Sequence, residues 1–387
     1  MLVNQIATIL NSVFTSETQE SQASVQEDLS NIVSVGQTIT ASTDFGNNFD
    51  NYVAKIVDKV GLTLYGTKYG IVDGLGLIRY GLEYASAIEK IRVDVGDYED
   101  NKAWQLTDNN IANSFTDLFN FVPASVDTIY YNQAGTFKVK ISIPEYQVKS
   151  AFKSREDMIR FFDYIEIRVK TKMQLALKYA EKRLLNNFIA EKIHANNGVI
   201  NLLAEYRNAT GDTTVTVANC LSSKEFLRFA SKTIGVYRSL LHEESGIFNV
   251  SNYVTHTSDD ELKMFFLTDF AKALESYLLS DTYHDNYVKQ DGYREIAFWQ
   301  NYVDGSVTEK SRINVKIASD NTTAVNQSGI LAVLLDKDAC FIASEQPNVK
   351  ALPNPDGDFT NYWHKFKACW YNDLAENGIV FIVQNPS

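Results

Sequence analysis

The chain has 387 residues, of which 45% are hydrophobic and 12% aromatic; 36 basic against 48 acidic residues give a net charge of −12. A chain of this size and composition buries enough apolar surface to fold, which excludes disorder over most of its length and predicts two or three cores. The negative charge argues against a dedicated nucleic-acid-binding protein, but it is compatible with a container that must not grip nucleic acid.

The cysteines and the N-terminus indicate the compartment in which the protein folds. Cys220, Cys340 and Cys369 lie far apart and form no CxxC pair, so we predict neither a zinc knuckle nor a disulfide framework, and a reducing compartment. The first residues, MLVNQIATILNSVF, lack the basic region of a signal peptide, and no run approaches 18 apolar residues. We therefore expect no membrane association.

The N-terminal segment predicts an arm. Residues 1–14 predict a short amphipathic helix that docks on another surface. Residues 15–44 are rich in Ser, Thr, Gln and Glu and hold few aliphatic residues, so we expect an extended arm that becomes ordered only against other chains. The alternative is a disordered tail. Residues 48–60 carry a helical apolar stripe that ends at Gly61.

The next segment predicts an excursion from the body of the protein. Residues 62–100 are punctuated by glycines and alternate apolar residues, which indicates a long two-stranded loop; its GLGLIRYG stretch lacks the GxGxxG spacing of a dinucleotide site. Two further strands, near 127–131 and 136–143, are joined by a turn at 132–135 and predict a hairpin.

One helix of about 40 residues is predicted at 154–196. Ser154 is its expected N-cap, with Asp157 as the reciprocal partner. We expect a break near Ile165–Val169, where β-branched residues lower helix propensity. Interrupted heptads favour a helix that lies across a sheet over the alternative of a coiled coil.

This predicted helix has two sides. Its apolar stripe comprises Met158, Phe162, Ile165, Val169, Met173, Ala176, Ala180, Leu184 and Phe188. Its expected charged side carries Lys170, Lys178, Glu181, Lys182 and Glu191.

The region after this helix indicates a compact α/β lobe. Helices are predicted at 222–244 and 259–279, and strands at 296–303, 312–319 and 329–344. The stretch 329–344 is apolar enough to form a buried central strand pair. Near the C-terminus, two aromatic-rich strands are predicted at 359–371 and 378–383, joined by a short polar turn.

A search for chemistry finds no active-site constellation. The sequence holds no HExxH, GxSxG or GxxxxGK[ST] motif. Asp336-Lys337-Asp338 predicts a polar turn between apolar strands, and Tyr283-His284-Asp285 a solvated loop. The sequence therefore predicts no catalytic, cofactor-binding or metal-ligating residues, and no enzyme. The five histidines, none with metal-ligand spacing, are His194, His242, His256, His284 and His364.

Three stretches carry a family resemblance: FDNYVAKIVDKVGLTLY (49–65), GILAVLLDKDACFIAS (329–344) and NYWHKFKACWYNDLAENGIVFIV (361–383). With the element order, they resemble the major capsid protein of tailed double-stranded DNA phages, the Hong Kong 97-type fold. The resemblance is greatest to the small phi29-like podoviruses of Gram-positive hosts.

The resemblance implies an α+β protein with an N-terminal arm, an extended β-hairpin loop, a peripheral domain and an axial α/β domain. The implied boundaries are 1–47 for the arm, 48–100 for the first helix and extended loop, 101–204 with 346–387 for the peripheral domain, 154–196 for its spine helix, and 205–345 for the axial domain.

The resemblance also implies a function. Such chains form hexamers and pentamers of an icosahedral shell that encloses packaged double-stranded DNA, assembled in the host cytoplasm with a separate scaffolding protein and a portal at one vertex. Some relatives cross-link an extended-loop lysine to an asparagine; Lys68, Lys90 and Asn377 are present here, but nothing in the sequence singles them out. The alternatives are an encapsulin-like shell of a cellular compartment and an α/β enzyme.

Overall fold

The computed structural model describes residues 3–17, 24–41, 74–80, 88–94, 125–131, 134–279, 292–301, 306–317, 319, 322–344, 348–354 and 356–385. The helix predicted at 48–60 lies outside these ranges, as do most of residues 62–100. No helix of the described residues is long and apolar enough to cross a membrane.

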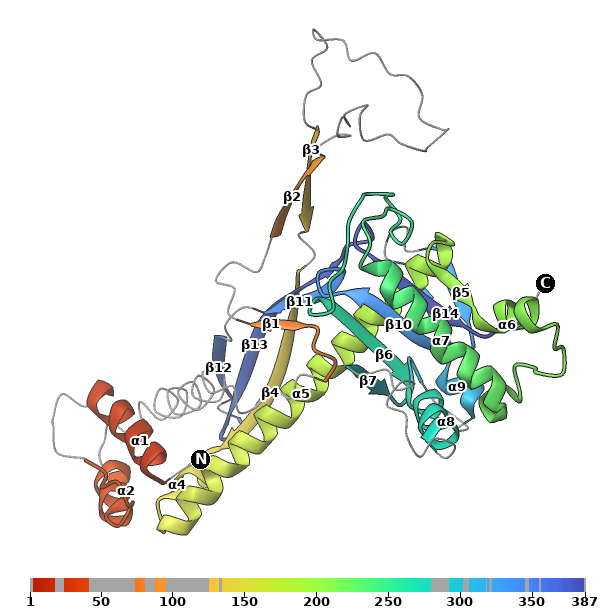
Figure 1. Ribbon diagram of the computed structural model, residues 1–387. Helices are drawn as coiled ribbons and strands as arrows, with labels where there is room; N and C mark the ends of the chain where they lie inside the picture. Colours follow the sequence, from red (N-terminus) through yellow and green to blue (C-terminus); the bar gives the residue numbers. More distant parts are fainter. Residues whose placement is uncertain are drawn as a thin grey trace, which may run out of the picture.

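An elongated lobe is built on the first of two five-stranded sheets (Figure 1). In this sheet β13 is the central strand, pairing antiparallel with β11, β12 and β4. The helix α5 (Arg155–His194) lies along β4 and β13, and the short helix α4 (Glu145–Ala151) precedes it. The strands are β1 (Ile78–Tyr80), β4 (Ala134–Pro144), β11 (Cys340–Ser344), β12 (Asn348–Asn354) and β13 (Phe359–Asn372).

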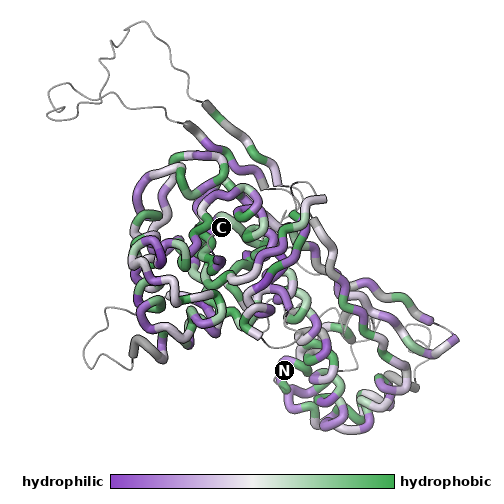
Figure 2. Tube along the Cα trace, turned by 90° about the vertical axis from the view of Figure 1, so that its right-hand side faces the viewer, coloured by the Kyte–Doolittle hydropathy of each residue, from purple (hydrophilic) through white to green (hydrophobic). Residues whose placement is uncertain are grey.

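A compact lobe is built on the second sheet, in the order β5-β14-β10-β6-β7. All seven residues of β10 are buried, so this strand is the centre of the lobe, where Figure 2 shows apolar stretches side by side. The strands are β5 (Val199–Asn201), β6 (Leu262–Leu267), β7 (Tyr293–Ile296), β10 (Ile330–Asp336) and β14 (Gly378–Ile382). The other elements of this lobe are α6 (Leu202–Thr210), α7 (Lys224–Leu241), α8 (Thr268–Leu279), α9 (Val307–Lys310), β8 (Ile313–Lys316) and β9 (Ala324–Gln327).

The long helix is present, and it is continuous. The Ser154 hydroxyl oxygen accepts from the Asp157 N–H at 3.0 Å, which confirms the N-cap. The same hydroxyl donates to the Asp157 carboxylate at 2.8 Å, in place of the expected reciprocal bond to backbone. The predicted break near Ile165–Val169 is wrong: Ile165 is fully buried, and its packing overrides a weak local propensity.

The expected charged side of α5 is wrong for its two glutamates. Glu181 and Glu191 are both buried. The Glu191 carboxylate accepts from the Ser319 N–H at 2.8 Å and from its hydroxyl at 2.9 Å. The last turns of α5 contact strands of both sheets, and most of their side chains are buried, so a one-sided apolar stripe does not describe them.

Two strand predictions are corrected by long-range pairing. Strands do form near 127–131 and 136–143, but they make no hairpin: β3 (Ser125–Tyr131) pairs with β2 (Ile88–Asp94), and β4 pairs with β13. The two-stranded loop predicted within 62–100 therefore takes its second strand, β3, from outside that range. Likewise β10 and β11 are both buried but belong to different sheets.

The helix predicted at 259–279 begins nine residues late. Residues 262–267 form β6, which lies between β10 and β7, and the helix α8 follows directly at Thr268. Four of the six β6 residues are buried, so the apolar run MFFL at 264–267 marks a central strand with both faces covered. The strand predicted at 296–303 is absent from 297–301, where β7 has already ended.

The N-terminal arm packs on its own subunit. The helix predicted at 1–14 is α1 (Val3–Glu17), and the segment expected to be extended contains α2 (Ile32–Ala41). Asn11 joins the two parts: its side chain donates to the Val25 carbonyl at 2.8 Å and accepts from its N–H at 2.7 Å. The apolar residues of the arm are buried without a neighbouring chain, among them Ile6, Leu10, Val13, Leu29 and Ile32.

A buried lysine in the last turn of α5, Lys192, predicts that the stability of the fold depends on pH. The Lys192 ammonium donates to the Asn197 side chain at 2.6 Å and to the Phe248 carbonyl at 2.7 Å, and burial lowers its pKa to about 7. An unfolded lysine keeps its proton to a pH of about 10. The free energy of unfolding therefore gains a contribution as pH rises from about 7 toward 10, where only the unfolded chain still binds this proton.

We expect Lys192→Met to lose this contribution. In urea unfolding at pH 7 and pH 9, the stability of the native chain should rise relative to the variant by up to about 1.4 kcal/mol per pH unit. Lys178→Met, at an exposed position of the same helix, should show no such change. A pH-independent difference between the native chain and Lys192→Met would contradict the assignment.

Candidate assembly site at the root of the extended ribbon

The strands β2 and β3 form a two-stranded ribbon that projects from the body of the protein (Figure 1). An isolated pair of strands is marginal in water, so its direction depends on what holds its root. Residues that face each other across an antiparallel pair lie on the same side. One side therefore carries Lys90, Arg92 and Tyr131, and the other Ile91, Val126 and Tyr130.

The first side is bound to the turn between β13 and β14. The Lys90 ammonium lies 2.7 Å from the Asp373 carboxylate and also pairs with Glu376. The Arg92 guanidinium pairs with Asp373 and lies 3.7 Å from Glu376. We call these four residues the charged root; Arg92 and Asp373 are almost fully buried within it.

The pKa shifts of the charged root follow from its geometry. Burial raises the pKa of Asp373, but the hydrogen bonds and charges of Lys90 and Arg92 outweigh it and leave that pKa below its usual value. Burial likewise lowers the pKa of Lys90, and the two carboxylates more than reverse this. Tyr131, beside Asp373, has its pKa raised first by burial and then by that carboxylate, and its ring meets Tyr371 edge-on at 5.5 Å. Lys90, Arg92 and Asp373 are therefore charged at neutral pH.

A second anchor holds residues 74–77, ahead of the ribbon. The buried Glu181 carboxylate of α5 accepts from the Leu75 N–H at 3.3 Å and from the Leu77 N–H at 3.1 Å. The Lys263 ammonium donates to the Gly76 carbonyl at 2.6 Å. Gly76 has φ +74°, a left-handed backbone conformation that favours glycine.

A third contact uses the Asp-Lys-Asp turn. The strand β1 pairs parallel with β11, and Arg79 of β1 pairs with Asp338 and stacks 3.9 Å from the Phe341 ring centroid. The predicted polar turn at 336–338 is confirmed at Lys337 to Ala339. Asp336 itself is buried and accepts from the Thr257 hydroxyl at 3.0 Å; burial raises its pKa.

The second side of the ribbon is exposed and carries three large apolar or aromatic side chains. Ile91, Val126 and Tyr130 are each more than half exposed in the single chain, and they share this side with the exposed Glu89, whose carboxylate accepts from the Tyr130 hydroxyl at 2.9 Å. Exposed large apolar side chains opposite a firmly held charged face are typical of a surface that a further chain covers. The arrangement positions a contact surface.

The residues examined for chemistry lie apart. Among the described residues no three His, Cys, Asp or Glu side chains are grouped to hold a metal ion. Burial lowers the pKa of His364 to about 4 and raises that of Cys340 to about 12, so both are neutral core groups. Of the cross-link residues, Lys90 belongs to the charged root, Asn377 is fully buried beside Thr257, and Lys68 lies outside the described residues.

Sequence comparison decides the family. A model of the Phi29-like phage major capsid protein family matches residues 8–382. The chain belongs to this family. It is a structural protein of the phage capsid, with the α+β, Hong Kong 97-type fold that the resemblance implied, and it builds a multimeric shell in the virion. The encapsulin-like alternative is not favoured.

Solved structures similar to the capsid protein include phage particles. The chain is 12% identical to the capsid structure of Staphylococcus phage Andhra, with a TM-score of 0.49, over 80% of this chain and 83% of that one. It is 12% identical to the structure of head fiber and inner core protein gp22 of native bacteriophage P68, with a TM-score of 0.47, over 80% of this chain and 83% of that one. It is 11% identical to the capsid structure of Cyanophage P-SCSP1u, with a TM-score of 0.45, over 82% of this chain and 89% of that one. Comparison with curated proteins gives no match.

The sequence did not reveal the anchors of the ribbon. Nothing in the sequence singles out Lys90, and the helical spacing predicts Glu181 on the charged side of α5. The polar turn that holds Asp373 and Glu376 indicates no role for either residue. The only available signal was a carboxylate-bearing turn, NDLAEN, between two strongly apolar strands.

We expect Asp373→Asn to loosen the ribbon. It leaves two buried or half-buried cations with one carboxylate, which should lower the free energy of unfolding by roughly 3 kcal/mol. Since the pKa of Asp373 is depressed in the folded chain, its contribution is present above pH 4 and lost as pH falls through the folded pKa. Acid unfolding monitored by circular dichroism should therefore be less pH-dependent in the variant. Asp260→Asn, at an exposed position, is the control.

Glu181→Gln tests the second anchor separately. Two backbone N–H groups that now bind a carboxylate would face a neutral amide, and hydrogen bonds to charged groups contribute about 1.5–3 kcal/mol. Amide hydrogen exchange at Leu75 and Leu77 should become about 10- to 100-fold faster. Glu156→Gln, exposed on the same helix, should leave both rates unchanged. Equal protection in Glu181→Gln and the native chain would refute the anchor.

Proposed function

We propose that the ribbon formed by β2 and β3 joins neighbouring copies of this capsid protein into hexamers and pentamers of an icosahedral shell around packaged double-stranded DNA. The observation that supports this is the division of the ribbon: its charged side is fixed to its own subunit, while Ile91, Val126 and Tyr130 face outward. A projecting, pre-oriented apolar surface loses little entropy when a neighbour covers it.

The proposed organisation follows the expected domains with changes at their boundaries. We assign most of 101–204 and of 346–387 to a peripheral domain, with α5 as its spine, and most of 205–345 to an axial domain. Because β14 pairs with β10 and β5, residues 199–201 and 378–382 go with the axial sheet, and because β11 pairs with β13, residues 340–344 go with the peripheral sheet. Residues 1–47 form an arm, and 48–100 lead through the first strand of the ribbon.

The remaining parts of the proposal concern partners and place. A separate scaffolding protein directs assembly in the host cytoplasm, and a portal occupies one vertex. The chain acts through its surfaces and performs no catalysis. The net charge of −12 favours mobile packaged DNA, since an excess of phosphate-binding lysines would trap it.

Ile91→Glu tests the ribbon contact. Burying a side chain of this size contributes roughly 1.5–3 kcal/mol, and the loss repeats at every contact of the shell, so we expect no closed shells in electron micrographs of the variant. Circular dichroism should show an unchanged fold, because Ile91 is exposed in the single chain. Ile91→Val should assemble normally. Closed shells of Ile91→Glu at native yield would refute the proposed contact.

A further inference from the structure

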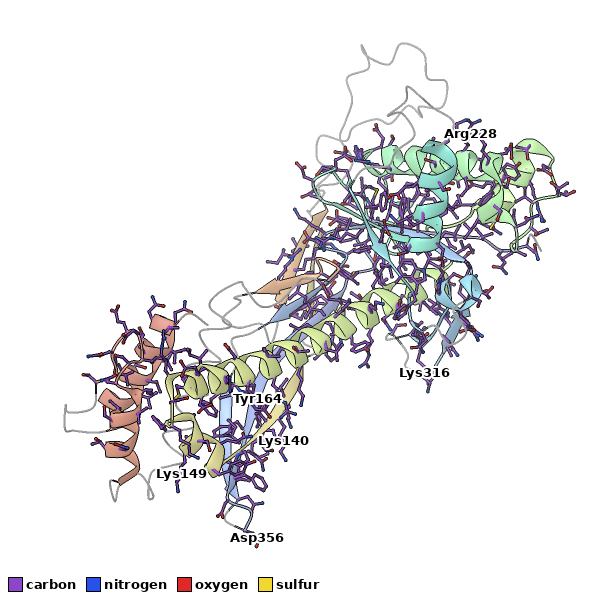
Figure 3. The ribbon with its side chains drawn as sticks, turned by 90° about the horizontal axis from the view of Figure 1, so that it is seen from below. Lys140, Lys149, Tyr164, Arg228, Lys316 and Asp356 are labelled. Atoms are coloured by element: carbon purple, nitrogen blue, oxygen red, sulfur yellow. The ribbon has the colours of Figure 1, made fainter. Side chains whose placement is uncertain are left out.

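A second apolar surface lies on the outer side of α5. Four large side chains on this side are exposed within the single chain, and their spacing of three, eight and four residues places them along one helical face. Figure 3 shows the first of them, Tyr164, on the elongated lobe. The exposed fractions are 39% for Tyr164, 62% for Ile167, 52% for Leu175 and 58% for Tyr179.

The charge of this face is opposite to that of the chain. Residues 167–183, IRVKTKMQLALKYAEKR, contain six cations and one acidic residue. That residue is Glu181, which is buried against Leu75 and Leu77 and so leaves the face to the cations. Arg168, Lys172, Lys178 and Arg183 are exposed there. We call these cations and the four apolar side chains the basic stripe.

The composition of the basic stripe selects the class of partner. Nucleic acid would pair with the cations, but its phosphates would leave Ile167 and Leu175 in water. An amphipathic helix with an apolar seam between acidic flanks covers both kinds of side chain, as in helix-in-groove recognition. Opposite charges across such a contact also fix the register and speed association.

The basic stripe ends where another segment of the same chain covers α5. Residues 298–299 lie on the helix there: Lys182 donates to the Phe298 carbonyl at 3.1 Å, and Asn186 donates to the Trp299 carbonyl at 3.0 Å. From Arg160 to Arg183 the open part of α5 spans about 35 Å. It therefore accepts a partner helix of about six turns.

We propose that the basic stripe of α5 is the docking surface for an acidic amphipathic helix of a separate assembly protein. The inference rests on the proposed function, because it identifies where the scaffolding protein binds. It requires that the partner helix carry apolar residues at intervals of three and four, with Asp and Glu beside them.

Site-specific photo-crosslinking tests the docking surface. Leu175→p-benzoylphenylalanine is produced in the full chain together with the phage head-assembly proteins, precursor shells are irradiated, and the joined peptide is sequenced by mass spectrometry. We expect a segment of another protein in which acidic residues outnumber basic ones and apolar residues recur every three or four positions. The control is Leu240→p-benzoylphenylalanine, at an exposed site of α7.

Charge reversal gives the second measurement. Lys172→Glu with Lys178→Glu should lower the cross-link yield from position 175 about tenfold, since attractive pairs become repulsive ones. Lys232→Glu with Lys316→Glu, at exposed sites elsewhere, should leave the yield unchanged. If the reversed chain forms no shells alone, the yield is measured in shells co-assembled with excess native chain.

Each outcome has a distinct meaning. A cross-link to DNA, to a second copy of this chain, or to a segment without the acidic amphipathic pattern overturns the inference, as does a yield no higher than at position 240. In all these cases shells still form, so the proposed function stands. Failure of the native chain to form shells under the same conditions would instead refute the proposed function.

Discussion

The charged root fixes the direction of the ribbon, and the rest of the assembly geometry depends on it. A two-stranded ribbon has no core, so its angle to the body is set by the contacts at its base. Arg92 and Asp373 are buried there, and a buried ion pair is a specific constraint more than a source of stability. Asp373 lies in the turn where the chain passes from β13, in one sheet, to β14, in the other. The ribbon is therefore attached at a point that connects the two sheets.

The helix α5 connects the two lobes of the subunit. Its N-terminal half lies on β4 and β13, its C-terminal turns contact β14 and β8, and Glu181 near its middle binds the segment ahead of the ribbon. A continuous helix of 40 residues is stiff because each turn is hydrogen-bonded to the next. The arm, the segment ahead of the ribbon and the compact lobe therefore all contact this one element.

Sequence reasoning recovered what is local. The N-cap at Ser154, the length of α5 and the turn after Asp336 follow from residues close together in the chain. It failed where a distant partner decides. Glu181 is buried by residues 104 and 106 positions away, and β2 pairs with a strand that begins more than 30 residues after it ends. The apolar run of β6 has no periodicity that distinguishes a central strand from a helix. The ribbon anchors were missed for the same reason, since each joins side chains from separate parts of the sequence.

A few carboxylates of this subunit are buried and a few large apolar side chains are exposed, and both placements are consistent with its function. The carboxylates of Glu181, Glu191 and Asp373 are buried, and each is satisfied by backbone N–H groups, a hydroxyl or cations, so they define geometry within the chain. Large apolar side chains such as Ile91 and Ile167 are exposed on the ribbon and on α5. Burying the carboxylates of α5 also removes negative charge from its surface and leaves a cationic face on an acidic protein. The same residues that stiffen the subunit thus determine which surfaces remain for other chains.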